Sequence, residues 1–311
     1  MISFASIVKD EISKIDTDEL SSISELSAIF YNAAIMPDKI KITTENASIA
    51  RHIFNLIKRK YEINPKIIVR KNINNHNKNL YILELSKKAD TILKDLSIID
   101  ENKKLEVPKD YITADEALRR AYLKGLFITC GSINDPKKSR YHLEFLVNSS
   151  KYANYISTLL NKEFLNSKVI KRDNRYMVYI KEAEKIGDFL RMIGAYNAIL
   201  YYEDIRIYRD HKNMTNRLNN CEQANIDKTI ETATKEVKNI ELIKKRDAFE
   251  LLSEKEQVVA EYRLKYKEAS LSELSEIISK ETSSPITKSG IYHRLKKVND
   301  LAKKIKEKEK F

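Results

Sequence analysis

The chain has 311 residues, 33% of them are charged, and its formal net charge is +12 at pH 7. A chain of this length can bury one large core or two smaller ones. The positive charge favours a polyanionic partner, nucleic acid before an anionic membrane, although a basic protein without such a partner has the same composition. Two cysteines, Cys130 and Cys221, stand outside any CxxC or Cys/His pattern, which excludes a disulfide framework and a zinc site. No cofactor is expected.

The N-terminal residues indicate where the protein resides. They lack the basic-then-apolar layout of a signal peptide. Instead, the apolar side chains Phe4, Ile7, Val8, Ile12 and Ile15 fit a short amphipathic helix. A reducing, cytoplasmic environment is the simplest interpretation.

Residues 1–107 are interpreted as the first of two repeats. Their apolar periodicity predicts the order helix, strand, helix, two strands and helix. The expected ranges are a helix at 24–34, a strand at 39–43, a helix at 47–61, strands at 67–69 and 81–85 around a polar turn at 72–79, and a helix at 89–96.

The strongest helical pattern in the chain covers residues 113–131. Thr113 and Glu116 have the spacing of a capping box, and Gly131 stands where a left-handed C-terminal cap would fall. The second half of this helix is apolar on almost every side, which is typical of a buried helix. A glycine inside a helix costs about 1 kcal/mol relative to alanine. We therefore expect a second helix to approach closely at Gly125.

Residues 108–205 repeat the succession of the first part. After the helix at 113–131 come a strand at 143–147, a helix at 152–164, a hairpin at 169–172 and 176–180, and a helix at 182–193. The two copies are offset by about 97 positions, with a seam near Pro108. The predicted fold of residues 1–205 is therefore α+β, built from a duplicated αββαββα unit.

Residues 123–131, LKGLFITCG, resemble the core helix of the LAGLIDADG homing endonucleases, with Gly125 and Gly131 on its two glycines. The resemblance implies two motif helices packed side by side and two antiparallel sheets that form a saddle over DNA. It also places the metal-binding acid of each motif at Cys130 and at Ala33, and the other acid at Ile128 and at Tyr31.

None of these four side chains is an acid, whereas a divalent cation used for phosphodiester cleavage needs hard oxygen ligands. We therefore expect no metal site and no catalytic residue. A nuclease that uses other acids, such as Glu144 and Asp135, is the alternative, although a charge on a strand face and a turn residue before Pro136 explain these two more simply.

Basic residues recur on the predicted strands. They form either a basic saddle or a solvated sheet face with lysines that block aggregation. Alternation alone does not assign them to a face. The residues are Lys39, Lys41, Lys66, Arg70, Lys71, Lys168, Lys171, Arg172 and Arg175.

Residues 206–250 are polar and are expected to form a helical linker. Within them, Arg209, Arg217, Asn219 and Asn220 are candidates for contacts with DNA phosphates. Helix caps and turns are the alternative role for these residues.

Residues 251–311 predict three short helices. Ser253 with Glu256 and Ser270 with Glu273 make two capping boxes, and Thr287 can cap the third helix. This spacing is typical of an all-α helix-turn-helix domain, in which the third helix reads DNA. A basic helical tail that binds nothing is the alternative. The candidate DNA-binding residues of the third helix are Lys288, Ser289, Tyr292, His293, Arg294, Lys296 and Lys297.

The whole chain resembles the WhiA family, most specifically at residues 123–135, 216–228 and 286–296. The resemblance implies a degenerate LAGLIDADG-like domain joined to a helix-turn-helix domain. It further implies a non-enzymatic, nucleoid-associated regulator of transcription that binds double-stranded DNA, with other transcription or cell-division proteins as candidate partners. Family members act in cell division and chromosome segregation, or in sporulation in some lineages. A divergent metal-dependent endonuclease and a basic nucleoid scaffold are the alternatives, and neither a membrane nor a small-molecule substrate is inferred.

Overall fold

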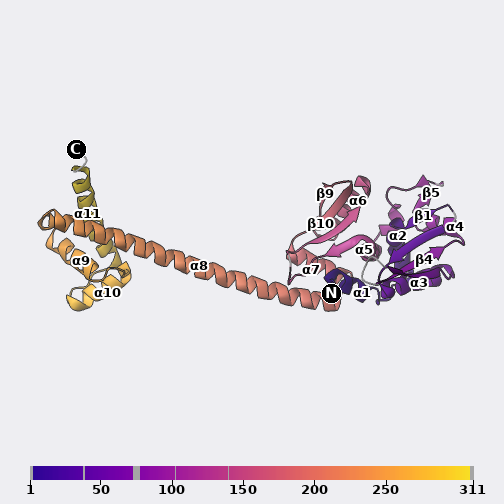
Figure 1. Ribbon diagram of the computed structural model, residues 1–311, viewed down its shortest axis with the longest axis horizontal. Coiled ribbons are helices and arrows are strands. Elements are labelled where there is room, and N and C mark those ends of the chain that lie inside the picture. The colour runs from indigo at the N-terminus through magenta and orange to yellow at the C-terminus, as the bar shows by residue number, and fades with distance from the viewer. Residues whose placement is uncertain (1–2, 38, 73–77, 102, 139, 309–311) are drawn as a thin grey trace. The chain divides into compact units, whose positions relative to one another are not determined.

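The computed structural model describes residues 3–37, 39–72, 78–101, 103–138 and 140–308. Residues 73–77, in the middle of the expected turn at 72–79, lie outside the described residues. The chain separates into two compact units, Met1–Asp210 and His211–Phe311, whose elements are labelled in Figure 1. Among the described residues, no helix is both long and apolar enough to cross a bilayer.

The first unit contains two four-stranded antiparallel sheets, with strand orders β1-β2-β4-β3 and β7-β8-β10-β9 (Figure 1). The matching orders confirm the predicted α+β duplication, because each repeat places a hairpin at the same edge of its sheet. The strands are β1 (Ala34–Met36), β2 (Lys39–Thr44), β3 (Lys66–Asn72), β4 (Lys78–Leu85), β7 (Gly131–Ile133), β8 (Leu143–Val147), β9 (Lys168–Arg172) and β10 (Arg175–Ile180), and β5 (Ile99–Asp100) pairs with β6 (Lys103–Lys104).

Helices pack on one face of each sheet. In the first repeat α3 contacts β2 and β4, and in the second α6 contacts β8, β9 and β10. One core of buried apolar side chains runs through both repeats. The helices of this unit are α1 (Phe4–Ile12), α2 (Glu19–Tyr31), α3 (Ala47–Tyr61), α4 (Ala89–Asp95), the 3-10 helix η1 (Asp110–Thr113), α5 (Glu116–Cys130), α6 (Ser150–Lys162) and α7 (Ala183–Met192).

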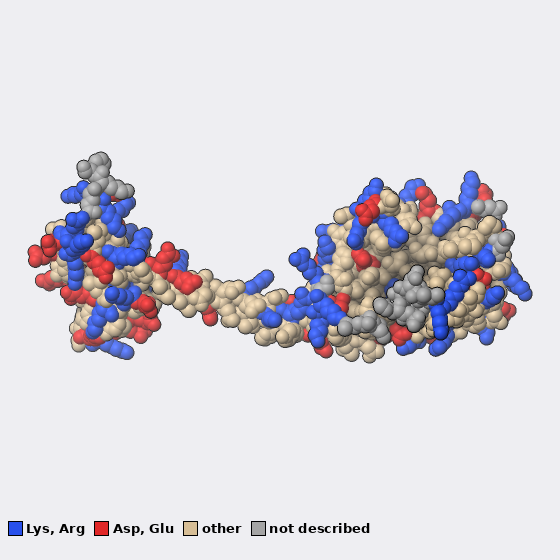
Figure 2. All heavy atoms as spheres, viewed as in Figure 1, with Lys and Arg blue, Asp and Glu red and all other residues tan. Residues whose placement is uncertain are grey.

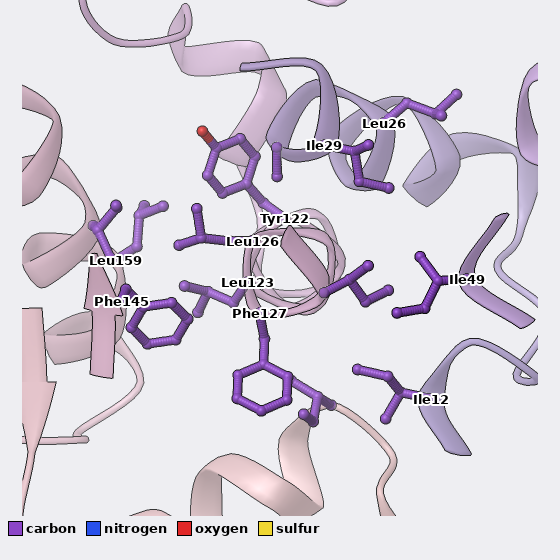
Figure 3. Packing of buried hydrophobic residues seen from close by; sticks show 14 of the residues in the cluster. Ile12, Leu26, Ile29, Ile49, Tyr122, Leu123, Leu126, Phe127, Phe145 and Leu159 are labelled. Atoms are coloured by element: carbon purple, nitrogen blue, oxygen red, sulfur yellow. The ribbon is translucent and has the colours of Figure 1, made fainter. Parts of the chain in front are cut away.

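The two motif helices, α2 and α5, pack against each other at the centre of this core. Figure 3 shows α5 end-on, with buried side chains from both repeats around it. A Cβ atom on Gly125 would lie 2.4 Å from the Glu25 carbonyl oxygen of α2. This distance confirms the expected close approach, since only glycine leaves room for the neighbouring backbone.

Both ends of α5 differ from the expectation. The N-terminal cap is Asp115, whose Oδ1 accepts a hydrogen bond from the Leu118 amide at 2.8 Å. Thr113 instead lies in η1 and shares a hydrogen bond with the Tyr155 hydroxyl. At the other end, Gly131 has φ −79° and ψ 149°, so the left-handed cap is wrong and the chain continues directly into β7. Glycine is needed there for space, because a Cβ would lie 2.3 Å from the Phe127 ring.

The first motif helix also differs from the prediction at 24–34. It begins at Glu19, after the cap Asp18, and ends at Tyr31. The next residues form β1, a strand of three residues that is too short to produce a period-two pattern. The same reasoning explains why β7 was not predicted.

The second unit is built on the C-terminal half of α8 (Tyr196–Lys245), a single helix of 50 residues. Residues 233–243 of this helix supply four buried apolar side chains, Ala233, Val237, Ile240 and Ile243. The last two belong to the core formed with α9 (Glu254–Lys265), α10 (Leu271–Glu281) and α11 (Lys288–Lys308). The end of the expected linker is thus part of the helix-turn-helix core, and the 3-10 helix η2 (Phe249–Leu251) connects it to α9.

The predicted capping boxes are both present in the second unit, at Ser253 with Glu256 and at Ser270 with Glu273. The boundaries expected at residues 205 and 250 remain predictions, whereas contacts divide the chain after Asp210.

Candidate nucleic-acid interface

The start of α11 is fixed by a cap and by its buried side. Thr287 Oγ1 accepts a hydrogen bond from the Gly290 amide at 3.1 Å, as expected for an N-terminal cap. Ile291, Leu295 and Val298 are buried, and the helix packs on α9 and α10. The opposite side therefore faces solvent, and its exposed residues are Lys288, Ser289, Tyr292, His293, Lys296 and Lys297.

The turn before α11 is held by two serines of α10. Ser275 Oγ donates to the Ile286 carbonyl at 2.7 Å, and the Ile286 amide donates to Ser279 Oγ at 3.0 Å. These bonds set the direction in which α11 leaves the turn. Neither serine was predicted from the sequence, although their spacing of four residues on one helix was a usable signal.

Two of the seven candidates on α11 are partly engaged within the unit. Arg294 is only half exposed. Lys297 Nζ lies 3.1 Å from Glu256 Oε1, so this lysine pairs with the capping-box acid of α9. Lys288 and Lys296 have no ion pair among the described residues. They are the cations of this face best placed for an external phosphate. In Figure 2, Lys and Arg side chains gather around α11.

The candidates in the linker all lie inside α8, so none of them is a cap or a turn residue. Arg209 donates to the Pro136 carbonyl at 2.6 Å and lies 4.9 Å from the centre of the Tyr141 ring. It therefore belongs to the first unit. Arg217, Asn219 and Asn220 are exposed.

Strand pairing assigns the basic sheet residues to faces, because directly opposed residues share a face. In the first repeat, Lys41 and Lys66 both oppose Glu84, away from the buried Ile40 and Leu83. Seven of the nine lie on the two faces without helices, whereas Lys71 and Lys171 lie on the other faces. The seven are Lys39, Lys41, Lys66, Arg70, Lys168, Arg172 and Arg175.

These two sheet faces are not uniformly basic. Ile68 opposes Ile82, and Ile170 opposes Met177, on the same faces as the cations. Lys41 also pairs with Glu84 at 3.2 Å. Figure 2 shows Lys and Arg side chains around the rim of the first unit, beside a hollowed area that is largely uncharged.

The ends of the motif helices do not fit a divalent cation. Burial raises the pKa of the Cys130 thiol to about 12, so it stays protonated at neutral pH. Burial lowers the pKa of the nearby Lys9 amine below its ordinary value, and the Cys130 sulfur offsets this effect only in part. A thiol beside an amine offers none of the oxygen ligands that magnesium requires.

The acids considered as substitutes have other contacts. Glu144 Oε2 lies 3.0 Å from His142 Nε2. Asp135 Oδ1 accepts from the Lys137 amide at 2.9 Å and from the Tyr201 hydroxyl at 3.2 Å. Within the described residues, no three His, Cys, Asp or Glu side chains come together as a metal site. No cleavage step can be derived from this arrangement.

Family models match along most of the chain. Residues 20–99 match the WhiA N-terminal LAGLIDADG-like domain, residues 119–212 the WhiA LAGLIDADG-like domain, and residues 215–302 the WhiA C-terminal HTH domain. The first two matches cover the repeats. The third begins within α8, in agreement with the contribution of that helix to the second unit.

Relatives and solved structures agree with these matches. The "Probable cell division protein WhiA" of Staphylococcus aureus (strain JH9) is 42% identical over 310 residues, which cover 98% of each chain. The crystal structure of full-length DUF199/WhiA from Thermatoga maritima aligns over 98% of both chains, with a TM-score of 0.56 and 26% identity. That of the N-terminal LAGLIDADG domain of DUF199/WhiA covers 62% of this chain and 90% of its own, with a TM-score of 0.50 and 23% identity. The chain therefore belongs to the WhiA family, as its sequence motifs predicted.

Proposed function

We propose that this protein is a DNA-binding transcriptional regulator without nuclease activity. The observation that carries the proposal is the exposed face at the start of α11, where Lys288, Tyr292 and Lys296 lie together on a helix whose opposite side is buried. An α-helix fits the major groove, and residues near the start of a recognition helix reach base edges there. The lysines neutralise phosphates, which makes binding dependent on salt.

The biological role is proposed from the relatives. The Staphylococcus aureus relative is named a probable cell division protein, and we propose the same process for this chain. Action on chromosome segregation, or on sporulation in some lineages, follows from the family resemblance. The expected location is the nucleoid in the cytoplasm.

The test uses the double variant Lys288→Ala, Lys296→Ala. A binding site is first selected from random DNA with the full-length protein, and affinity is then measured at several salt concentrations. We expect affinity for that site to fall about tenfold or more, and the log–log salt slope to become shallower by about two, because two phosphate contacts are lost. The matched control is Lys303→Ala, Lys304→Ala, which removes two exposed lysines near the other end of α11. Unchanged binding by the first variant would show that this face does not contact DNA.

The nuclease alternative predicts a different result. The similarity of the fold to LAGLIDADG domains favours it, and the chemistry of Cys130 and Lys9 opposes it. Incubation with supercoiled plasmid and magnesium or manganese should leave the plasmid intact. Nicking that a chelator abolishes would establish the nuclease. A nucleoid scaffold would instead bind all random sequences with one affinity and a steep salt slope.

A further inference from the structure

One segment of α8 does not pack against the rest of the unit to which it belongs. Residues 211–228 are exposed on every side. At 1.5 Å per residue this segment is about 27 Å long. Helices in proteins are stabilised mainly by packing of one face, so an exposed segment of this length calls for a partner outside the chain.

Four of the five asparagines of this segment lie on one face of the helix. At about 100° per residue, Asn213, Asn216, Asn219 and Asn220 fall within an arc of about 120°. We call these four residues the carboxamide face. Asn225 lies on the opposite side of the helix, near Met214 and Leu218, by the same geometry.

The carboxamide face makes no internal hydrogen bond in the described part of the chain. Elsewhere, asparagine side chains are engaged: Asn161 accepts from the Ser167 amide, and Asn239 donates to Asn299. Asparagine is also a poor helix former, so four of them lower the stability of an isolated helix. Their donors and acceptors are available to a ligand.

The charge of the segment indicates the kind of ligand. Lys212 and Arg217 are exposed and have no ion pair among the described residues, and no acid occurs from residue 211 to residue 221. A carboxamide can bind the major-groove edge of adenine through two hydrogen bonds: its NH2 group donates to N7, and its oxygen accepts from the N6 amino group. Basic side chains beside it can contact phosphates.

We propose that the carboxamide face of α8 reads adenine-containing base pairs in the major groove of double-stranded DNA, as a second reading helix besides α11. The proposal rests on the proposed DNA-binding function. It assigns base contacts to Asn216 and Asn220, which lie one turn apart, and phosphate contacts to Lys212 and Arg217.

The test uses full-length protein and the double variant Asn216→Ala, Asn220→Ala. Alanine is the better helix former, so the variant keeps α8, and circular dichroism checks this. The matched control is Leu218→Ala, Asn225→Ala on the opposite side. Each protein binds the selected site and the same site with its adenines replaced by 7-deazaadenine, which lacks the N7 acceptor.

The expected result is at least a tenfold loss of affinity for the Asn216→Ala, Asn220→Ala variant, with the control unaffected. Wild-type protein should bind the 7-deazaadenine site about as weakly as the variant binds the unmodified site. The variant, which lacks the proposed contacts, should bind both sites with nearly the same affinity. Wild-type affinity of the variant would overturn the proposal. So would an equal loss in the control accompanied by a change from dimer to monomer, which would assign the segment to a second copy.

The Lys288→Ala, Lys296→Ala variant is measured in parallel. If that variant binds normally, the function proposed for α11 fails. If it loses binding while the Asn216→Ala, Asn220→Ala variant does not, only the role of α8 fails.

Discussion

Both units bury charged side chains where helices meet, but the number of hydrogen-bond and ion-pair partners of these charges differs between the units. In the first unit Glu25 of α2 is fully buried. Its carboxylate accepts from Thr17 Oγ1 at 2.5 Å and lies 2.7 Å from His52 Nε2. Lys124 of α5 lies 3.4 Å away and also donates to Thr17 Oγ1 at 2.9 Å. Thr17, which precedes α2, His52 of α3 and Lys124 of α5 thus surround one carboxylate.

In the second unit the buried charges form a single pair. Arg263 of α9 is 2% exposed, and its Nε lies 2.9 Å from Glu236 Oε2 of α8. These two atoms are not aligned for a hydrogen bond, and neither has another hydrogen-bond partner. The guanidinium is held mainly by the Ala269 carbonyl, to which Nη1 donates at 2.5 Å.

This difference indicates which of the buried charges stabilises the fold. Burial of ions costs several kcal/mol each, and good geometry with further hydrogen bonds is needed to offset that cost. The Glu25 cluster meets this condition and connects helices of both repeats. The Arg263–Glu236 pair meets it only in part, so apolar residues should replace it more easily.

The largest expected effect is on the Glu25 cluster. Glu25→Gln leaves the Lys124 charge buried without its counterion, and we expect the free energy of unfolding to fall by about 3–5 kcal/mol. Urea denaturation followed by circular dichroism measures this. The matched control is Glu116→Gln, which removes an exposed acid from the start of α5 and should change stability by less than about 1 kcal/mol.

The double variant Arg263→Met, Glu236→Leu sharpens the comparison. Replacing a buried pair by apolar residues of similar volume is often neutral or stabilising by about 1–4 kcal/mol, and the poor alignment favours that outcome here. The corresponding variant of the first unit, Glu25→Leu with Lys124→Met, should be clearly destabilised, because His52 and Thr17 lose their partner. Equal losses in the two double variants would contradict the distinction.

The glycines of the two units provide a smaller contrast. Gly125→Ala places a Cβ 2.4 Å from the Glu25 carbonyl oxygen, and such overpacking costs about 1–3 kcal/mol. Gly290→Ala in α11 meets Ile286 Cγ1 at 3.4 Å, an ordinary contact. It should stabilise the helix by up to about 1 kcal/mol. Thermal unfolding should show melting temperatures that move in opposite directions.

The smallest expected effect is on the way in which the stability of the fold depends on pH. Burial alone would raise the pKa of Glu25, but the His52 hydrogen bond and the Lys124 charge outweigh it and hold the pKa below its ordinary value. The stability that Glu25 contributes is therefore present above its unfolded pKa of about 4.3 and lost as the pH falls through the lower folded value. The difference in melting temperature between wild type and Glu25→Gln should narrow below about pH 4.3.

The pH dependence of stability that Glu236 causes should have the opposite sign. Burial raises its pKa, against the effect of Arg263, so ionisation of Glu236 costs stability as the pH rises through the raised value. The stability of wild type relative to Glu236→Gln should fall as the pH increases from about 4 to 7. The stability of wild type relative to each variant is measured as a function of pH. If the profiles for Glu25→Gln and Glu236→Gln have the same slope, the two carboxylates do not affect stability with opposite signs.

Local patterns and spacing in the sequence determined much of this protein. The capping boxes at Ser253 and Ser270 were predicted because they depend on residues three positions apart. The duplication was visible because helices and hairpins recur in the same order. Gly125 indicated a close helix contact because its cost inside a helix needed a reason. The absence of an acid at positions 33 and 130 could be predicted from the alignment with the LAGLIDADG motif alone.

Only the tertiary structure decided how distant parts use these elements. Periodicity could not show that the end of α8 packs into the helix-turn-helix core, because its sparse apolar side chains acquire a partner only on folding. Nor could alternation assign Lys71 and Lys171 to the helix-covered faces, since strand register depends on pairing with remote strands. The Glu25 cluster was invisible for the same reason: its members are up to 107 positions apart, and burial alone brings them together.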